Sequence, residues 1–551
     1  MERWTGKVAV ITGASAGIGA AVARSLLKHG MIVAGFARRA EKIKEIADSL
    51  EDSPGKLHPV ECDVTKEESV LAAFAWVKEN LGPISVLVNS AGITKESSLI
   101  DGTLEDWQSV FDVNVLGLCL CTREAVRVMR ETAEDAVVIH VNSLAAERIP
   151  FIPGFSVYPA SKRAVTGLAQ TLRHELAGTR IRVTNISPGL VATDFMASYS
   201  IFSPEAMAAT PTLNADDVAA AAIYVLSNPP HVLVCHLLIV QNIQDVVLRP
   251  LGESCNIRER VSVISDDDTR YLGVVDGDGH AEAPSSSERY FLVHIVARTQ
   301  SLNMTSLLNK IVLITGASSG IGKALVEDLV SKGLKVIGLA SDLNKLKILA
   351  EELKGKPGKL IPLQCDLSIQ SEIETALEWI EKNLGSIDIL INSASINLDW
   401  SSINGGIEEL KKTLDINLLG LTLITKGVLQ LMKNKGLDNG IIVNINDIIG
   451  LKWLPLASDR PISPAYASSK SALTALTESL RLELAQNESN IKVINICPGL
   501  VETEMTQQWL KENPRLALKP KDVAEAILFT LQTPENVLIK DLIITPIREI
   551  N

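Results

Sequence analysis

Positive charge and long hydrophobic runs are both scarce in this chain of 551 residues. Its 53 Lys and Arg are outnumbered by 65 Asp and Glu, for a formal net charge of −12. A nucleic-acid-binding protein needs basic residues to neutralise phosphates, so we expect no nucleic-acid partner. The nearest candidate for an apolar span, residues 232–240, is too short for a bilayer and contains His236, so we expect no membrane span.

Cysteine and histidine are too few and too scattered for the sites that they commonly form. The seven cysteines include no Cys-x-x-Cys pair and no spacing typical of a disulfide framework, which indicates reduced thiols. Residues 295–551 contain no histidine, and those before residue 250 lie in no nucleophile-elbow motif, which argues against a Ser-His-Asp hydrolase. We expect no metal site. The N-terminus leads directly into a strand without a signal peptide, so we expect a cytoplasmic location.

The chain contains the same set of motifs twice. Lys7–Gly19 returns as Lys310–Gly322, at an offset of 303 residues. The same offset relates further residues, namely Cys62 and Cys365, Asn89 and Asn392, and Asn114 and Asn417. A period of this length indicates a duplicated domain. We expect one domain over residues 1–250, a polar and largely disordered linker over 251–305, and a second domain over 306–551.

The spacing of two methionines raises the question of how the copies were joined. Met304 stands six residues before Lys310, as Met1 stands six before Lys7. A genuine fusion of two neighbouring genes gives this spacing, and so does an artefact of gene prediction. A peptide spanning residues 250–310 in native material excludes the artefact.

Each copy alternates short β-branched runs with amphipathic helical segments, a rhythm typical of βαβ units. In the first copy we expect strands at residues 8–11, 32–37, 86–89, 137–142 and 183–187, and a helix from about 18 to 29. Hydrophobic residues make up 46% of the chain, which suits sheets that are covered on both faces. The predicted fold class is α/β, with two tandem Rossmann-type doubly wound parallel-sheet domains.

A glycine-rich turn follows the first strand of each copy. Its glycines allow a tight turn and bring a pyrophosphate close to the next helix N-terminus, where N–H groups and the helix dipole favour anions. A plain glycine turn is the alternative, and two occurrences between a strand and a helix disfavour it. The cofactor-binding residues expected here are Gly13, Ser15, Gly17, Ile18 and Gly19, and Gly316, Ser318, Gly320, Ile321 and Gly322.

The end of the second strand indicates which dinucleotide is preferred. The first copy has Arg38 and Arg39 there, and a guanidinium suits a 2′-phosphate where an acid would repel it. The alternative is a pair of solvated surface arginines. We expect NADP(H) in the first domain. The second copy has Ser341 and Asp342, so we expect NAD(P)(H) or no cofactor there.

Further motifs follow in a fixed order over residues 5–250. They are Asn-Ser-Ala-Gly at 89–92, Asn114, Asn142-Ser143, Tyr158-x-x-x-Lys162 and Pro188-Gly189-x-x-x-Thr193. This ordered set resembles the short-chain dehydrogenase/reductase superfamily. The resemblance implies an NADP-dependent alcohol dehydrogenase or carbonyl reductase whose catalytic residues are Asn114, Ser143, Tyr158 and Lys162. It also implies cofactor contacts from Asp63, Val64, Asn89, Tyr158, Lys162, Val191 and Thr193, and from Asp366, Leu367 and Asn392 in the second copy.

Shorter segments of the first copy carry a closer resemblance. Residues 1–4, 35–39, 119–125 and 141–143 are similar to insect farnesol dehydrogenases, and equally to a mammalian group of keto-steroid and carbonyl reductases. The resemblance implies a small apolar alcohol or carbonyl substrate, either a farnesol-like isoprenoid or a keto-steroid. The region after Thr193 holds an apolar set suited to such a substrate, with ordinary loop packing as the alternative: Phe195, Met196, Tyr199, Phe202 and Met207.

Elementary chemistry supports the assigned roles. Tyr158 and Lys162 are four residues apart on a predicted helix and therefore share a face. A free phenol has a pKa near 10, and a nearby ammonium together with the nicotinamide charge should lower it. Tyr158 would then exchange a proton with the substrate oxygen, which Ser143 would hold, while Lys162 would also bind the nicotinamide ribose. An ordinary helix residue and a strand-end cap are the alternatives. The family resemblance implies that Asn114 orients a water.

The second copy departs from the first at its reacting centre. It keeps Asn417, Tyr466 and Lys470 but has Asp447 where the first has Ser143 and Ser395 where the first has Gly92. A carboxylate cannot donate a hydrogen bond to a carbonyl, and its charge should raise the pKa of Tyr466.

The segment between this aspartate and Tyr466 is also four residues longer than its counterpart in the first copy. We expect impaired catalysis in the second domain. Three alternatives stay open: rescue by Ser458 or Ser463, a structural role as half of an intrachain pseudo-dimer or in a homo-oligomer, and a non-catalytic nucleotide-binding or sensor function.

Overall fold

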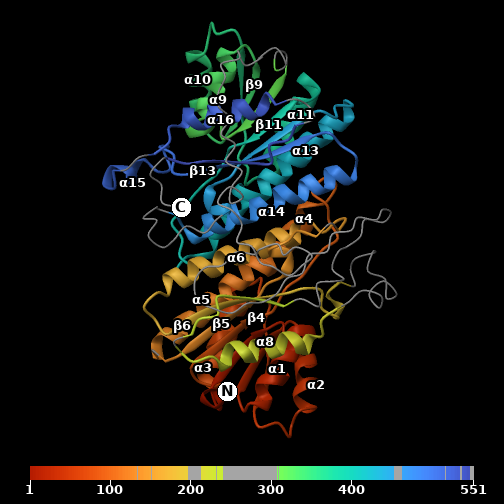
Figure 1. Cartoon of the computed structure of the whole chain (residues 1–551), viewed down its shortest axis with the longest axis vertical. Coiled ribbons are helices and arrows are strands. Elements are labelled where there is room, and N and C mark those ends of the chain that lie inside the picture. The colour runs from red at the N-terminus through yellow and green to blue at the C-terminus, as the bar shows by residue number, and fades with distance from the viewer. Residues whose placement is uncertain are drawn as a thin grey trace, which may run out of the picture.

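A computed structural model describes most of both copies. The described residues are 1–132, 134–150, 152–196, 212–230, 232–239, 307, 310–451, 462–514, 517–533 and 537–546. Each copy folds around its own sheet, and the two domains lie at opposite ends of the molecule (Figure 1). The expected linker and both of its boundaries lie outside the described residues.

Each domain contains a seven-stranded parallel sheet. The first sheet has the order β3-β2-β1-β4-β5-β6-β7 and the second the order β10-β9-β8-β11-β12-β13-β14. In both, the strand order reverses next to the first strand, the point at which open α/β sheets bind ligands. The strands of the first sheet are β1 (Val8–Thr12), β2 (Ile32–Ala37), β3 (Lys56–Glu61), β4 (Ile84–Asn89), β5 (Ala136–Val141), β6 (Ile181–Pro188) and β7 (His236–Ile239). Those of the second are β8 (Ile311–Thr315), β9 (Lys335–Ala340), β10 (Lys359–Gln364), β11 (Ile389–Asn392), β12 (Ile441–Ile445), β13 (Lys492–Pro498) and β14 (Asp541–Ile544).

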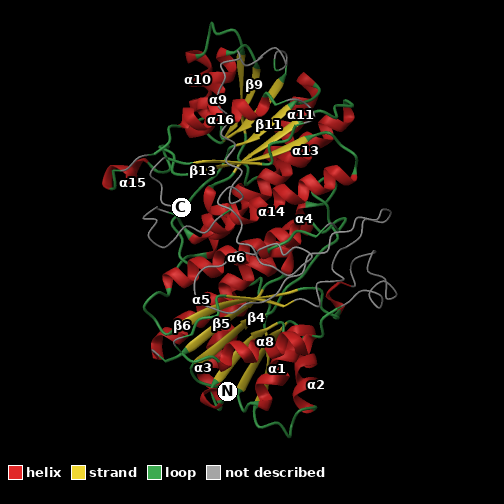
Figure 2. Cartoon of the chain, viewed as in Figure 1, coloured by secondary structure: helices red, strands yellow, loops and turns green. Residues whose placement is uncertain are grey.

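Helices cover both faces of each sheet (Figure 2). In the first domain they are α1 (Gly17–Lys28), α2 (Ala40–Asp48), α3 (Glu67–Asn80), α4 (Leu104–Phe111), α5 (Leu118–Thr132), α6 (Val157–Glu175) and α8 (Ala215–Ser227). In the second they are α9 (Gly320–Ser331), α10 (Leu343–Glu352), α11 (Gln370–Leu384), α12 (Ile407–Leu414), α13 (Leu421–Asn434), α14 (Pro464–Gln486), α15 (Gln507–Glu512) and α16 (Pro520–Leu531). The first sheet packs against α1 and α8 on one face and against α3 and α5 on the other.

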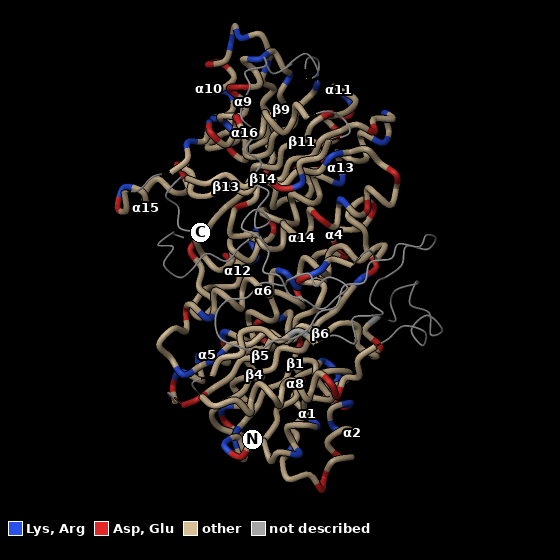
Figure 3. Tube along the Cα trace, viewed as in Figure 1, with Lys and Arg blue, Asp and Glu red and all other residues tan. Residues whose placement is uncertain are grey.

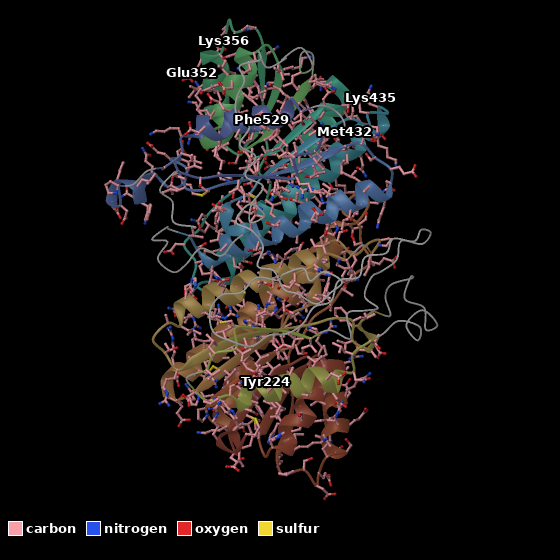
Figure 4. All side chains as sticks on the ribbon, in the orientation of Figure 1. Tyr224, Glu352, Lys356, Met432, Lys435 and Phe529 are labelled. Carbon is pink, nitrogen blue, oxygen red and sulfur yellow. The ribbon has the colours of Figure 1, made fainter. Side chains whose placement is uncertain are left out.

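The central strands are buried on both faces, which explains their continuous apolar composition. Every residue of β1, β4 and β5 is buried. The amphipathic helices that cover them leave a polar outer face, where basic and acidic residues are interspersed (Figure 3). A side chain such as Tyr224 of α8 is 55% exposed on that outer side (Figure 4). The predicted α/β fold class is confirmed for both domains.

One continuous helical stretch, Ile407–Asn434, is long and apolar enough to cross a membrane. It comprises α12, the π-helical turn η7 (Asp415–Gly420) and α13. However, 72% of its most apolar 18-residue window is buried inside the protein. Because core helices of globular domains have the same length and composition, we assign this stretch to the core of the second domain.

The two domains pack against each other through α6 and α14, which lie side by side (Figure 1). The contacts repeat across a pseudo-two-fold axis. Arg123 donates to the carbonyl oxygen of Gly405 at 3.4 Å, and its counterpart Lys426 donates to the carbonyl oxygen of Gly102 at 2.7 Å. One cluster of buried apolar side chains contains residues of both domains, among them Phe111. The copies therefore pair within one chain, while further oligomerisation stays a prediction.

Candidate active site

The glycine-rich turn between β1 and α1 has a backbone that only glycine fits. Gly13 has φ +69°, and a Cβ there would lie 2.9 Å from Cα of Ala91. A Cβ on Gly19 would lie 2.3 Å from the carbonyl oxygen of Gly13. The N-cap of α1 is Ala16, which offers no capping side chain. The first-turn N–H groups of α1 therefore suit an anionic group, and this cradle fits the pyrophosphate of a dinucleotide.

Most of the other expected cofactor residues surround this turn or the neighbouring strand ends. Thr193 lies against Gly17, where a Cβ would come within 3.3 Å of its methyl group. Arg38 and Arg39 are exposed where β2 ends. Ser15, Ile18 and Val64 are half-buried.

Three expected cofactor residues are already engaged with the protein itself. Asp63 accepts hydrogen bonds from the backbone and hydroxyl of Thr65, at 3.1 and 2.8 Å. The side-chain amide of Asn89 donates to the hydroxyl of Thr122 at 2.9 Å. Val191 forms a β-bridge with Leu213. Asn89 therefore links β4 to α5, and this contact is independent of any ligand.

Ser143, Tyr158 and Lys162 come together beyond the carboxyl end of β5. Ser143 follows the strand, and its hydroxyl accepts from the backbone N–H of Ala145 at 3.1 Å. Tyr158 lies in the first turn of α6. One helical turn later, Nζ of Lys162 donates to the carbonyl oxygen of Val141 at 2.9 Å and lies 5.7 Å from the centre of the Tyr158 ring. The structure thus brings together three of the side chains that the sequence indicates as catalytic.

Asn114 is held within a π-helical turn, η2 (Asp112–Gly117), between α4 and α5. Its Oδ1 accepts from the backbone N–H of Ile93 at 2.8 Å, and its Nδ2 donates to the carbonyl oxygen of Ile93 and to the hydroxyl of Ser161. Single π-helical turns occur frequently at functional sites. Asn114 joins the loop after β4 to the helix of Tyr158, and its role in orienting water stays a prediction.

The pKa values of the buried pair move in directions that the sequence did not suggest. Burial raises the pKa of Tyr158 to about 12, although a hydrogen bond with Ser143 acts to lower it. Burial also lowers the pKa of Lys162 to about 8. The expected lowering of the phenol pKa is therefore not produced by the protein groups, because desolvation outweighs them. Tyr158 therefore keeps its proton at neutral pH, and its release requires a positive charge that stabilises the phenolate.

Apolar side chains flank the Tyr158 ring. The ring centres of Phe155 and Phe195 lie 5.0 and 5.4 Å from that of Tyr158. Ala145, Ile152 and Leu190 complete the same cluster. Phe195, one of the expected apolar residues, thus lies beside Tyr158, and its contact with a substrate stays a prediction. Only the backbone of Met196 is described, and three expected residues lie outside the described part of the chain: Tyr199, Phe202 and Met207.

In the second domain, the hydroxyl of Tyr466 is engaged by the carboxylate that replaces the serine. It donates to Oδ2 of Asp447 at 3.2 Å, and Oδ1 of Asp447 accepts from the backbone N–H of Ile449 at 3.0 Å. Lys470 donates to the carbonyl oxygen of Ile445 at 3.0 Å, and burial lowers its pKa to about 8. Asn417 repeats the bonds of Asn114, to Ile396 and Ser469.

The alternatives for a rescuing hydroxyl differ in position. The hydroxyl of Ser463 caps α14 by accepting from the backbone N–H of Tyr466, at 3.2 Å, and rescue by this hydroxyl stays a prediction. Ser458 lies outside the described residues. The hydroxyl of Ser395 is buried and has no hydrogen-bond partner among the described residues. It lines a cleft with Asp447.

The second nucleotide turn keeps the geometry of the first. Gly316 has φ +64° and Gly320 has φ +51°, and a Cβ on Gly322 would lie 2.3 Å from the carbonyl oxygen of Gly316. The N-cap of its helix, Ser319, makes no side-chain cap bond. This turn lines the same cleft as Tyr466 and Lys470.

Several residues around the second turn make hydrogen bonds within their own domain. Asp342 caps α10 by accepting from the backbone N–H groups of Asn344 and Lys345. The remaining expected residues are placed like their counterparts: Asp366 accepts from Ser368, Leu367 lies against Gly420, Asn392 donates to Thr425 and Asn444, and Ser318 and Ile321 are half-buried.

Two contributors to the first site were missed from the sequence. Phe155 packs on Tyr158. The hydroxyl of Ser161 accepts a hydrogen bond from the side-chain amide of Asn114 and donates one to the backbone oxygen of Tyr158 at 2.7 Å. Ser161 directly precedes Lys162, and Ser469 directly precedes Lys470. Its recurrence in both copies was the signal that could have identified it.

Comparisons with known proteins agree with the duplication. The family model described as short chain dehydrogenase matches residues 7–202 and again 310–514. Farnesol dehydrogenase of Aedes aegypti is 41% identical over 258 residues, which cover 46% of this chain and 99% of the relative. Dehydrogenase/reductase SDR family member 11 of Gallus gallus is 43% identical over 259 residues, 45% of this chain and 98% of the relative. A solved structure of serine dehydrogenase complexed with NADP+ is 28% identical and covers 46% of this chain and 100% of that chain, with a TM-score of 0.40.

Proposed function

Because the chain belongs to the short chain dehydrogenase family, we propose that its first domain interconverts an alcohol and a carbonyl on an apolar substrate, using NADP(H). One observation carries the proposal. The hydroxyls of Ser143 and Tyr158 and the ammonium of Lys162 meet beside two aromatic rings, at the edge of the sheet where the glycine-rich turn also lies. Acid–base groups and an apolar wall are thus available at one place.

The residues divide the chemistry between them. Bound NADPH supplies a hydride to the carbonyl carbon. Tyr158, which is protonated at neutral pH, donates its proton to the carbonyl oxygen. The Ser143 hydroxyl donates a hydrogen bond to the same oxygen. The ammonium of Lys162 lies 5.7 Å from the centre of the phenol ring. Its positive charge stabilises the phenolate that is left after proton transfer.

The cofactor preference rests on the exposed arginines at the end of β2. Arg38 and Arg39 offer planar donors that match a 2′-phosphate. Burial opposes a lowered pKa of the Asp63 carboxyl, hydrogen bonds from Thr65 lower it, and the positive charges of Lys66 and Arg38 lower it further. We assign NADP(H) to the first domain on this ground.

The six cysteines of the described part are free, which supports a reducing, cytoplasmic location.

The apolar cluster around Tyr158 supports the substrate class. Phe155 and Phe195 offer ring faces and edges but no hydrogen-bonding groups, which suits an isoprenoid or steroid skeleton. The farnesol dehydrogenase name of a 41% identical relative points the same way. We propose a farnesol-like alcohol or a keto-steroid as the substrate.

A second candidate function concerns the second domain. Its Tyr466 hydroxyl is engaged by Asp447, while its glycine-rich turn is intact. We propose that this domain binds a dinucleotide without efficient turnover and serves the first domain as a partner.

The test is to incubate the purified chain with NADPH and to follow its oxidation with farnesal, with a keto-steroid and with a small polar aldehyde. We expect turnover of the apolar carbonyls, slower turnover of the polar one, and a weaker reaction with NADH. If no carbonyl is reduced and no apolar alcohol is oxidised, with dinucleotide binding retained, the chain is a nucleotide-binding protein and the proposed activity is wrong.

A further inference from the structure

Two glutamates at equivalent positions cross the interface between the domains, one from each side. Glu175 ends α6, and Glu483 occupies the same position on α14. Both oxygens of Glu175 accept from the backbone N–H of Ser402 at 3.1 Å. Both oxygens of Glu483 accept from the backbone N–H of Leu99 at 2.9 Å, and Leu99 is the counterpart of Ser402. Each carboxylate thus holds the loop after the fourth strand of the other domain.

The symmetry ends at the start of the catalytic helix. Glu483 also accepts a hydrogen bond from the hydroxyl of Ser156, the residue just before α6, and one from the backbone N–H of Ile100 at 3.3 Å. Ser479, one turn earlier on α14, donates to the carbonyl oxygen of Ser156 at 3.3 Å. The second domain therefore binds both the hydroxyl and the carbonyl oxygen of Ser156.

Among the described residues, the first domain makes no equivalent hydrogen bonds to the start of α14. The position of Ser156 is taken there by Pro464, which has neither a hydroxyl nor an N–H. The start of α14 is instead fixed within its own domain, where the backbone N–H of Ser463 donates to Oδ1 of Asn397 at 3.2 Å. The hydroxyl of Thr171, the counterpart of Ser479, donates to carbonyl oxygens of its own helix.

The residues that Glu483 and Ser479 bind at the start of α6 lie next to Tyr158. Ser156 stands two residues before it, and Phe155 packs directly on its ring. The loop that contains Leu99 is joined to the same segment, because the backbone N–H of Ser97 donates to the carbonyl oxygen of Gly154 at 2.9 Å. Glu483 therefore holds both stretches of the chain that together carry one wall of the site.

We propose that Glu483 of the second domain is a positioning residue for Tyr158 of the first, so that the second domain supports catalysis in the first through this carboxylate. The inference rests on the proposed function. Glu483 is only 6% exposed, and a buried carboxylate with several donors makes stronger hydrogen bonds than a neutral acceptor. Its loss leaves three donors to find other partners and frees the residues before Tyr158 to move. Small displacements of a reacting group lower turnover more than they lower binding.

The experiment compares Glu483→Ala with the matched variant Glu175→Ala, both in the full chain. Each removes a glutamate from the same pseudo-symmetric interface, but only the first acts on the segment before Tyr158. For Glu483→Ala we expect kcat for an apolar carbonyl to fall about tenfold, with the KM for NADPH nearly unchanged. For Glu175→Ala we expect kcat within about twofold of the unaltered chain. Glu483→Gln, which keeps an acceptor oxygen, should recover most of the loss.

Hydrogen exchange provides a readout that needs no turnover. Amides in residues 93–103 and 152–162 should exchange faster in Glu483→Ala, whereas Glu175→Ala should loosen residues 400–406 instead. If the two variants lower kcat equally, or if Glu483→Ala leaves kcat unchanged, the carboxylate only holds the domains together and the proposal is wrong.

Two further results keep the inference separate from the proposed function. If the unaltered chain reduces no carbonyl, the proposed function fails, and faster exchange confined to the two segments in Glu483→Ala still supports the positioning of Tyr158. If Glu483→Ala does not fold, Ser156→Ala takes its place, because it removes only the hydroxyl contact. We then expect a fall in kcat of about threefold, and an unchanged kcat overturns the proposal.

Discussion

The hydroxyl of Tyr466 donates a hydrogen bond to the carboxylate of Asp447 across 3.2 Å. In the first domain, the same position beside the tyrosine is held by the hydroxyl of Ser143, which can itself donate to a substrate oxygen. An anion in this place attracts the tyrosine proton and repels a carbonyl oxygen that is gaining negative charge. The two domains thus have nearly the same set of side chains, and we expect them to differ in their capacity for proton transfer.

Replacing Asp447 by Ser should restore activity to the second domain. The test is made in a full chain that also carries Tyr158→Phe, so that the first domain is silent. Loss of one positioned donor lowers rates by roughly 10²–10³, so the added serine should raise residual carbonyl reduction at least tenfold. Steady-state rates with NADPH and with NADH measure the effect.

The control is Asp447→Asn in the same background, which removes the charge without supplying a hydroxyl. If both substitutions leave the rate at background while the chain still binds a dinucleotide, Asp447 is not what limits the second site.

Tyr158→Phe should stop turnover in the first domain. The ring keeps its packing against Phe155 and Phe195, but the proton donor is gone. General acid–base groups contribute roughly 10²–10⁴ in rate, so kcat should fall by at least 10² while NADPH binding stays within about twofold. Retention of more than about a tenth of the activity would show that another group donates the proton.

Arg38→Asp should move cofactor preference from NADP toward NAD. An acid at the end of β2 repels a 2′-phosphate and accepts hydrogen bonds from a free ribose. The ratio of kcat/KM for NADPH to that for NADH should fall by about 10² or more. Arg24→Asp, a basic residue of α1 paired with Asp216, is the control and should leave the ratio unchanged. An unaltered ratio in Arg38→Asp refutes the assignment.

The domain interface should become more stable as the pH falls. The pKa of Asp415 is raised from 3.8 to about 6: burial raises it most, the positive charge of Lys411 opposes this, and the negative charge of Asp112 in the other domain adds to it. The folded chain therefore binds this proton more tightly than the unfolded chain does. Stability declines as the pH rises from about 4 through 6, and the full destabilisation is present above pH 6.

Asp415→Asn removes that charge and should stabilise the chain at pH 8. After allowance for solvent screening we expect about 1 kcal/mol, a rise in Tm of about 2–4 °C, because the site is only partly buried. The gain should shrink toward zero below pH 4. A gain that is independent of pH contradicts this origin. Asp438→Asn is a useful contrast, since hydrogen bonds from Ser489 and Asn490 lower the pKa of that carboxyl and its loss should destabilise.

The fold followed closely from the sequence wherever strands are buried on both faces. The expected strands 32–37 and 137–142 correspond to β2 and β5 within one residue, because continuous apolar runs bounded by polar turns leave little ambiguity. The third strand, β3, was not anticipated. Only Leu57 and Val60 are buried in this edge strand, and they are three residues apart, so the sequence shows no period of two; Pro59 weakens the strand pattern further.

The site was predictable in its members but not in its electrostatics. Ser143, Tyr158 and Lys162 are recognisable by order and spacing, and the structure brings them together. The pKa of Tyr158 was expected to fall, yet desolvation raises it, and desolvation depends on packing from distant segments such as Phe195. Glu483 was equally out of reach, because its partners Leu99 and Ser156 lie more than 300 residues away in the chain.

The helices α6 and α14 begin with different residues, and this difference has a consequence for how such a chain can evolve. In a homodimer, one gene encodes both sides of a two-fold interface, so a serine introduced at one helix start appears at the other as well. Here Ser156 and Pro464 are encoded separately. A mutation can therefore change the contacts at the start of α6 without changing those at the start of α14. Selection on one domain then no longer constrains the sequence of the other.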